Sequence, residues 1–110
     1  MRYGMVFVLE VRDFESGEEF SIVSMPGDYV RTAGWADEHL ADVAGGDVVR
    51  SIERNYALLW HALERLGRTA ELGLAAELDA GCIGAMMDRF SVFVEDFEEK
   101  DIPLTEGRAR

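Results

Sequence analysis

The sequence predicts an α+β fold in which an N-terminal antiparallel β-hairpin packs on a small bundle of three to four α-helices. Apolar residues alternate with period two over residues 5–25, and they recur with helical spacing over residues 47–66. A chain of 110 residues has room for one domain, which we place at residues 1–100, followed by a polar tail at residues 101–110. The hairpin needs the helices, because two strands alone are only marginally stable in water.

Residues 5–25 are predicted to form the two strands of the hairpin. The polar stretch between the strands contains Ser16 and Gly17, which favours a turn with Gly17 in a left-handed conformation. One face of the hairpin carries the larger apolar side chains and should pack against the longest helix and the first tryptophan. The residues of that contact are Phe7, Leu9, Phe20, Ile22, Leu59, Leu63 and Trp35.

The next two elements are predicted to be helices. Pro26-Gly27-Asp28 ends the hairpin, and Asp28 is a candidate N-cap for a weak helix over residues 28–42. Asp47 is a candidate N-cap for a strong helix over residues 47–66, and Gly67 is its stop signal. One apolar stripe runs along this second helix, comprising Val49, Ile52, Tyr56, Leu59, Trp60, Leu63 and Leu66.

Two further helices are predicted over residues 69–78 and 80–98. Gly73 and Gly81 weaken this region, but the apolar residues keep a helical spacing. The second of these helices would end before Pro103, because the residue before a proline is disfavoured in helical conformation. Its predicted apolar face consists of Ile83, Met86, Met87, Phe90, Phe93, Val94 and Phe97.

The charge balance indicates which partners the chain can have. With 22 acidic and 11 basic residues the net charge is −11, which disfavours nucleic-acid binding because no basic stripe is available to neutralise phosphates. No apolar run reaches the length of a membrane span, so we expect no membrane insertion. A single cysteine, Cys82, allows no disulfide within the chain and suits a reducing compartment, so we expect a cytoplasmic location.

The residues capable of catalysis form no known motif. His39, His61 and Cys82 are present, but none is followed at a characteristic spacing by catalytic partners. His61 and Glu64 could share a metal ion, although no third ligand is indicated and such neighbours are common on helix surfaces. The sequence therefore predicts a protein that is not an enzyme, with no catalytic residue, no metal site and no cofactor.

The apolar and aromatic residues of two predicted helices are candidates for binding a partner protein. Methionine and phenylalanine in the last helix could form an adaptable groove, although such a stripe is more often part of the core. Trp35 could be an exposed interface anchor or a plug between the hairpin and the long helix. The candidate partner-binding residues are Tyr29, Trp35, Met86, Met87, Phe90, Phe93 and Phe97.

Two segments carry a resemblance to a known family. The hairpin sequence MVFVLEVRDFESGEEFSIVS and the helix sequence YALLWHALERLGR, separated by a tryptophan-containing helix, resemble the tail assembly chaperones of long-tailed (siphovirus-type) bacteriophages and prophages. The resemblance spans residues 5–98. The phrase Leu58-Leu59-Trp60-His61-Ala62-Leu63-Glu64-Arg65-Leu66-Gly67 matches the end of a family helix, with Glu64 where lysine is common. Gly34 and Trp35 depart from the family, which has a stronger helix with a buried acidic residue there.

The resemblance implies a role in virion assembly rather than catalysis. Such chaperones bind the phage tape measure protein, keep it soluble and aid assembly of the tail tube protein in the cytoplasm of the bacterial host. An acidic domain with apolar faces is compatible with this role, since its charge keeps a complex soluble without excluding self-association.

The acidic composition also allows a different class of function. The chain could be an inhibitor that mimics nucleic acid and places carboxylates in the cleft of a basic partner protein. Binding by charge weakens with ionic strength, whereas binding by apolar contact persists, so salt separates the two hypotheses. The carboxylates of this second hypothesis are Asp88, Glu95, Asp96, Glu98, Glu99 and Asp101.

Overall fold

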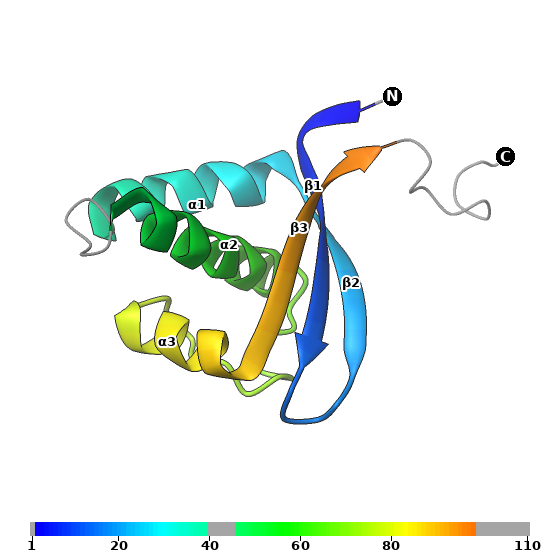
Figure 1. Ribbon diagram of the computed structural model, residues 1–110, viewed down its shortest axis with the longest axis vertical. Helices are drawn as coiled ribbons and strands as arrows, with labels where there is room; N and C mark the ends of the chain where they lie inside the picture. Colours follow the sequence, from blue (N-terminus) through cyan, green and yellow to red (C-terminus); the bar gives the residue numbers. More distant parts are fainter. Residues whose placement is uncertain (1, 40–45, 99–110) are drawn as a thin grey trace, which may run out of the picture.

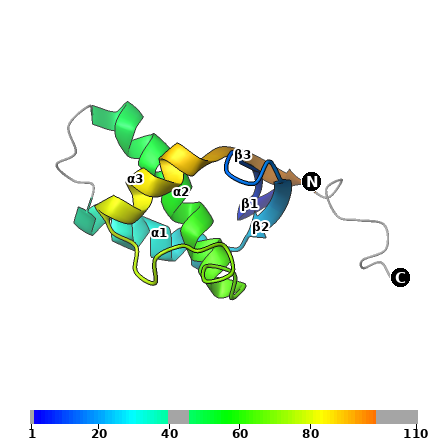
Figure 2. The ribbon, with the colours of Figure 1, turned by 90° about the horizontal axis from the view of Figure 1, so that it is seen from below.

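The chain forms an α+β fold in which three helices cover one face of a three-stranded antiparallel sheet (Figure 1). The computed structural model describes residues 2–39 and 46–98, so the predicted tail at residues 101–110 lies outside the described residues. The elements within these ranges are β1 (Arg2–Asp13), β2 (Glu19–Ser24), α1 (Pro26–His39), α2 (Gly46–Arg65), α3 (Ala80–Arg89) and β3 (Phe90–Glu98). A view turned by 90° again shows the helices on a single side of the sheet (Figure 2).

The predicted hairpin is confirmed, and its two strands pair in register. Val11 lies opposite Phe20 and Leu9 lies opposite Ile22, so their side chains share the face that the helices cover. Gly17 closes the turn with a φ of 80°, a left-handed conformation in which a residue with a Cβ would be strained. The strand order is β2-β1-β3, which makes β1 the central strand.

Helix α1 begins earlier than predicted, and the role of Asp28 differs from the predicted one. Pro26 occupies the first helical position, where its missing N–H is not needed. Asp28 is the third helical residue, and its carboxylate accepts a hydrogen bond of 2.9 Å from the backbone N–H of Met25, the reverse half of a capping box. The fully buried carboxylate also binds Arg65 Nε at 2.9 and 3.0 Å, which fastens α1 to the end of α2.

Helix α2 is the element that sequence periodicity located best. It ends at Arg65, and Gly67 adopts a φ of 72° just beyond it. The amide of Arg68 donates to the Leu63 carbonyl at 2.8 Å and the amide of Gly67 donates to the Glu64 carbonyl at 3.0 Å, which together form a Schellman motif. The side chains of Asp47 and Val49 lie outside the described residues.

The core lies between the sheet and α2, with α3 closing it. Leu59 and Leu63 of α2 are fully buried in one cluster with Leu9 and Ile22 of the hairpin, as the apolar stripe predicts. The cluster of buried residues consists of Leu9, Val11, Ile22, Leu58, Leu59, Trp60, Ala62, Leu63, Cys82, Met86 and Phe90.

The predicted helix over residues 69–78 is wrong. Only one turn forms, and Gly73 ends it with a φ of 73° while the amide of Leu74 donates to the Thr69 carbonyl at 2.8 Å. The indole N–H groups of Trp60 and Trp35 donate to the carbonyls of Ala75 and Leu78, at 3.2 and 3.1 Å. The later part of the irregular segment, residues 75–78, is therefore fixed by side chains of the two preceding helices.

The predicted helix over residues 80–98 is also wrong in its second half. It stops at Arg89, and residues 90–98 form the strand β3, which pairs antiparallel with β1. Val92 and Val94 face Val11 and Leu9 across this ladder. Alternating Phe and Val residues suit a half-buried strand, and pairing with β1 outweighs the helical spacing of the same residues.

The central position of Leu63 gives a direct test of this packing. Leu63→Ala should lower the free energy of unfolding by about 2–5 kcal/mol, because a fully buried leucine is replaced in a close-packed core. Leu66→Ala, at a site nearly half exposed, is the matched control and should cost about 1 kcal/mol or less. Urea unfolding monitored by circular dichroism measures both values, and equal costs would contradict the assigned core.

Candidate functional site

The predicted partner-binding residues do not form one surface. Met86 and Phe90 are each only 1% exposed and belong to the core, so a partner cannot reach them without unfolding the domain. Tyr29 is half-buried and packs against Phe7, with ring centroids 5.7 Å apart. Trp35 is half-buried between the Leu78 carbonyl and the His39 ring, which stacks on it at 5.0 Å. These residues therefore hold the fold together.

The remaining candidates reach the surface at different places. Met87, on α3, is 37% exposed, whereas Phe93 is 63% exposed on the face of the sheet that carries no helix. Phe97 is half-buried on that same sheet face and makes further contacts. Because α3 and β3 are different elements, the single helical stripe that would have joined these residues does not exist.

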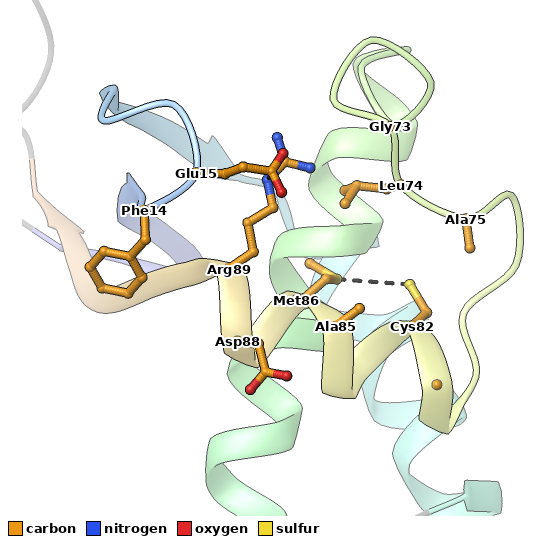
Figure 3. A pocket seen from close by; sticks show the side chains of 11 residues that line it. Phe14, Glu15, Gly73, Leu74, Ala75, Cys82, Ala85, Met86, Asp88 and Arg89 are labelled. Carbon is orange, nitrogen blue, oxygen red and sulfur yellow. Dashed lines mark hydrogen bonds and ion pairs between the residues drawn. The ribbon is translucent and has the colours of Figure 1, made fainter.

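A hollow of about 910 Å³ lies beside α3, and we call it the α3 hollow (Figure 3). It is bounded by the turn after β1, by the irregular segment around Leu74 and by one side of α3. The sulfur atoms of Cys82 and Met86 lie 3.9 Å apart at its base. The residues that line it are Phe14, Glu15, Gly73, Leu74, Ala75, Gly81, Cys82, Ala85, Met86, Asp88 and Arg89.

A buried ion pair fixes one wall of the α3 hollow. Arg89, the last residue of α3, donates to Asp13 through Nε at 3.1 Å and through Nη2 at 2.9 Å. Its third donor, Nη1, bonds the carbonyl of Leu72. Asp13 also accepts from the backbone N–H of Glu15 at 2.9 Å, so the pair joins the turn after β1, the irregular segment and the junction of α3 with β3.

The bonds to Asp13 set its protonation. The hydrogen bonds from Arg89 lower the pKa of Asp13 from 3.8 to about 2, although burial acts in the opposite direction. The same bonds raise the pKa of Arg89 above its usual value. Each of the three guanidinium nitrogens of Arg89 thus donates a hydrogen bond within the fold, and its charge is offset by Asp13.

The rim of the α3 hollow is acidic and apolar. Glu15 and Asp88 are exposed, and Figure 3 shows Glu15 beside Arg89 and Asp88 on α3 with its carboxylate directed away from Glu15. Phe14 is 60% exposed, which is unusual for a phenylalanine. Sequence analysis missed Phe14 because it stands in a polar turn, where no periodic pattern marks it. The opposite side is formed by Ala75 and Cys82.

Burial shifts the titration of two other groups near the core. It raises the pKa of the Cys82 thiol, so this cysteine is not an activated nucleophile. It lowers the pKa of His61, whose Nδ1 lies 2.9 Å from the Ala57 carbonyl and 3.1 Å from Thr32 Oγ1. Because a carbonyl can only accept, we assign the proton to Nδ1 of a neutral ring. His61 therefore serves the contact between α1 and α2.

The helix-free face of the sheet is the second candidate surface, and we call it the open sheet face. Its members alternate with the buried residues of each strand. Ser21 Oγ donates to Glu10 Oε1 at 2.7 Å, and Arg12 forms an ion pair with Glu19 at 3.0 Å, so the polar groups pair across neighbouring strands. The exposed members are Glu10, Arg12, Glu19, Ser21, Val23, Ser91, Phe93 and Glu95, with Val8 half-buried.

The acidic residues of the mimic hypothesis are scattered in the structure. Asp88 is on α3, while Glu95 and Asp96 are consecutive in β3 and so point to opposite faces of the sheet. The Glu98 side chain, Glu99 and Asp101 lie outside the described residues. Among residues 2–39 and 46–98, no group of three His, Cys, Asp or Glu side chains is arranged to hold a metal ion. No helix in the same ranges is long and apolar enough to cross a membrane.

The Asp13–Arg89 pair makes stability depend on acid pH. Its contribution is complete above the unfolded-state pKa of 3.8 and is lost as the pH falls toward the folded-state pKa of about 2. Asp13→Asn should therefore lower the free energy of unfolding at pH 7 by about 2–3 kcal/mol, because a fall of the Asp13 pKa from 3.8 to about 2 corresponds to ~1.4 kcal/mol per unit. The variant should also lose the part of the pH dependence that falls between pH 4 and pH 2.

Urea unfolding at a series of pH values measures both effects. Glu15→Gln is the matched control, since this exposed carboxylate lies at the longer distance of 3.8 Å from Arg89, and it should change stability by about 0.5 kcal/mol or less. Identical pH profiles for the wild type and Asp13→Asn would contradict the role assigned to the pair.

Comparison with known proteins identifies no family. No family model matches the chain, and neither does any curated protein or solved structure. The resemblance of the hairpin and of the α2 sequence to tail assembly chaperones therefore stays a prediction. What the protein does has to be argued from its surfaces.

Proposed function

We propose that the chain is a binding protein without catalytic activity, and specifically a phage or prophage tail assembly chaperone. In this role it binds the tape measure protein and aids assembly of the tail tube. The observation that carries the proposal is the exposure of large apolar side chains on a strongly acidic chain. Phe14 and Phe93 are 60% and 63% exposed, although the net charge is −11.

This combination suits a protein that keeps an apolar partner in solution. Phenylalanine side chains have large apolar areas whose removal from water is worth about 25 cal/mol per Å². Acidic residues elsewhere on the surface make the complex repel other copies and remain soluble. Residues 5–98 resemble tail assembly chaperones, and for this reason we take the tape measure protein as the partner.

The use of the buried ionisable groups agrees with a role other than catalysis. Asp13 binds Arg89 and the turn after β1, and Asp28 binds Arg65 and the start of α1. His61 bonds to the backbone of its own helix. Each group is held by contacts that stabilise the fold, whereas a catalytic acid or base has to reach a substrate.

Co-expression with the longest helical protein encoded nearby tests the proposal. We expect the two proteins to co-elute in size-exclusion chromatography at about 0.1 M salt and also at about 1 M salt, because apolar contacts are not screened. Phe14→Ser combined with Phe93→Ser should abolish the complex. The control variant, Glu95→Gln combined with Asp96→Asn, should retain it.

The other outcomes point away from a chaperone. A complex that dissociates at high salt and is lost in the Glu95→Gln, Asp96→Asn variant would favour the acidic inhibitor that mimics nucleic acid. Failure of the wild-type proteins to co-elute at either salt concentration would overturn the proposed partner.

A further inference from the structure

We propose that the α3 hollow is the binding site for one amphipathic partner helix that carries basic residues. This inference rests on the proposed function and deepens it, because it assigns the binding surface and the chemistry of the segment that is bound. Three features of the hollow support it: its size and apolar base, the small side chains of α3 along it, and the charge of its rim.

The size and lining of the hollow suit apolar side chains of a partner. A volume of about 910 Å³ lies at the upper end of the usual range for binding pockets. Leu74 and Ala75 form an apolar side of the hollow, whereas Met86 and Cys82, which are 1% and 6% exposed, close its base from the core. An apolar side of this kind suits the apolar face of an amphipathic helix.

The residues of α3 along the hollow are small enough for a helix backbone to come close. Gly81 and Ala85 are one turn apart and both line the hollow. Gly84 lies between them on the exposed side, and a Cβ added there would meet nothing within 4 Å. Glycine is less favourable than alanine inside a helix, and packing within this chain does not require glycine at this position. Gly84 itself does not line the hollow, whereas Gly81 and Ala85 do, and their small side chains leave room for a partner helix to approach.

The charge of the rim selects a basic partner. Glu15 and Asp88 are exposed carboxylates at the hollow. The only cation among the lining residues is Arg89, which is bonded to Asp13 and to the Leu72 carbonyl and lies 3.8 Å from Glu15, so the three carboxylates Asp13, Glu15 and Asp88 outnumber it. A lysine or arginine at the edge of an amphipathic helix would therefore meet unbalanced negative charge, while an acidic helix would be repelled.

The open sheet face is less suited to the same helix. Its charged and polar side chains are already paired between strands, as in Ser21 with Glu10 and Arg12 with Glu19. This pattern is typical of the solvated face of an antiparallel sheet. Phe93 is a large exposed group there, but its neighbour on β1 is Glu10, so the apolar area around it is interrupted.

Model peptides test the inference without knowledge of the natural partner. The first peptide has about 18 residues, five helical turns, with leucine on one face and lysine on the other. The second has glutamate in place of every lysine. We expect the leucine–lysine peptide to bind with an affinity measurable by fluorescence anisotropy and the leucine–glutamate peptide not to bind.

Two pairs of variants locate the binding site. Ala85→Trp fills the hollow and should weaken binding of the leucine–lysine peptide by roughly tenfold or more, whereas Ala80→Trp, on the same helix but outside the lining, should leave it unchanged. Asp88→Lys should weaken binding by a similar factor. Glu95→Lys makes the same charge change on the open sheet face and should have a much smaller effect.

The outcomes separate this inference from the proposed function. Equal losses with Asp88→Lys and Glu95→Lys, or unchanged binding by Ala85→Trp, would overturn the assignment of the hollow. If the nearby helical protein still co-elutes with the Ala85→Trp variant, the chaperone proposal survives and only the hollow is wrong. Thermal melts monitored by circular dichroism verify that each variant is folded before its binding is compared.

Discussion

The ion pair between Asp13 and Arg89 is the interaction on which the arrangement of this fold depends. It joins residues that are 76 positions apart and bonds the irregular segment through the Leu72 carbonyl. Two charges taken out of water are favourable only when both are present and fully hydrogen-bonded. The pair therefore fixes the relative positions of the end of β1, the end of α3 and the segment between α2 and α3. The α3 hollow exists because these three parts are held in place around it.

A second polar cluster has the same function at the other end of the helical layer. Asp28 receives hydrogen bonds from Arg65, from Arg31 at 2.6 Å and from the backbone of Met25. Thr32 Oγ1 donates to the Asp28 carbonyl at 2.8 Å and lies beside His61. The apolar core can accommodate several helix orientations, whereas directed bonds of this kind accept only one. The protein thus combines a modest core with two buried carboxylates that fix its elements.

The parts of the fold that sequence analysis located are those determined by neighbouring residues. The stripe that includes Leu59 and Leu63 specifies α2, and Gly67 ends it through bonds within one turn. Residues 90–97 could not be assigned in this way, since Phe90, Phe93 and Phe97 also fit a helical spacing. Their conformation is decided by pairing with β1, whose residues lie about eighty positions earlier in the chain. Gly73 was expected only to weaken the helix over residues 69–78, whereas it stops that helix after one turn.

The candidate site was less accessible to sequence analysis than the fold. Of the residues proposed from the apolar stripe, Met86 contributes to the base of the α3 hollow, but Phe90 and Trp35 are structural. Phe14 and Arg89 had no distinguishing pattern, because a turn phenylalanine and a terminal helix arginine acquire their roles only after distant segments meet. The backbone N–H of Glu15 donates to the Asp13 carboxylate in an Asx-type turn, and this bond depends only on neighbouring residues.

The junction between α3 and β3 has an evolutionary consequence. Helix α3 ends at Arg89 and β3 begins at Phe90, whose amide still donates to the Met86 carbonyl, so no loop residue separates them. Most proteins absorb insertions and deletions in loops between such elements. Here one added residue would turn Val92 and Val94 away from the core and bring their polar neighbours inward. The packing of β3 against β1 and the helices therefore constrains the length of the chain at this point.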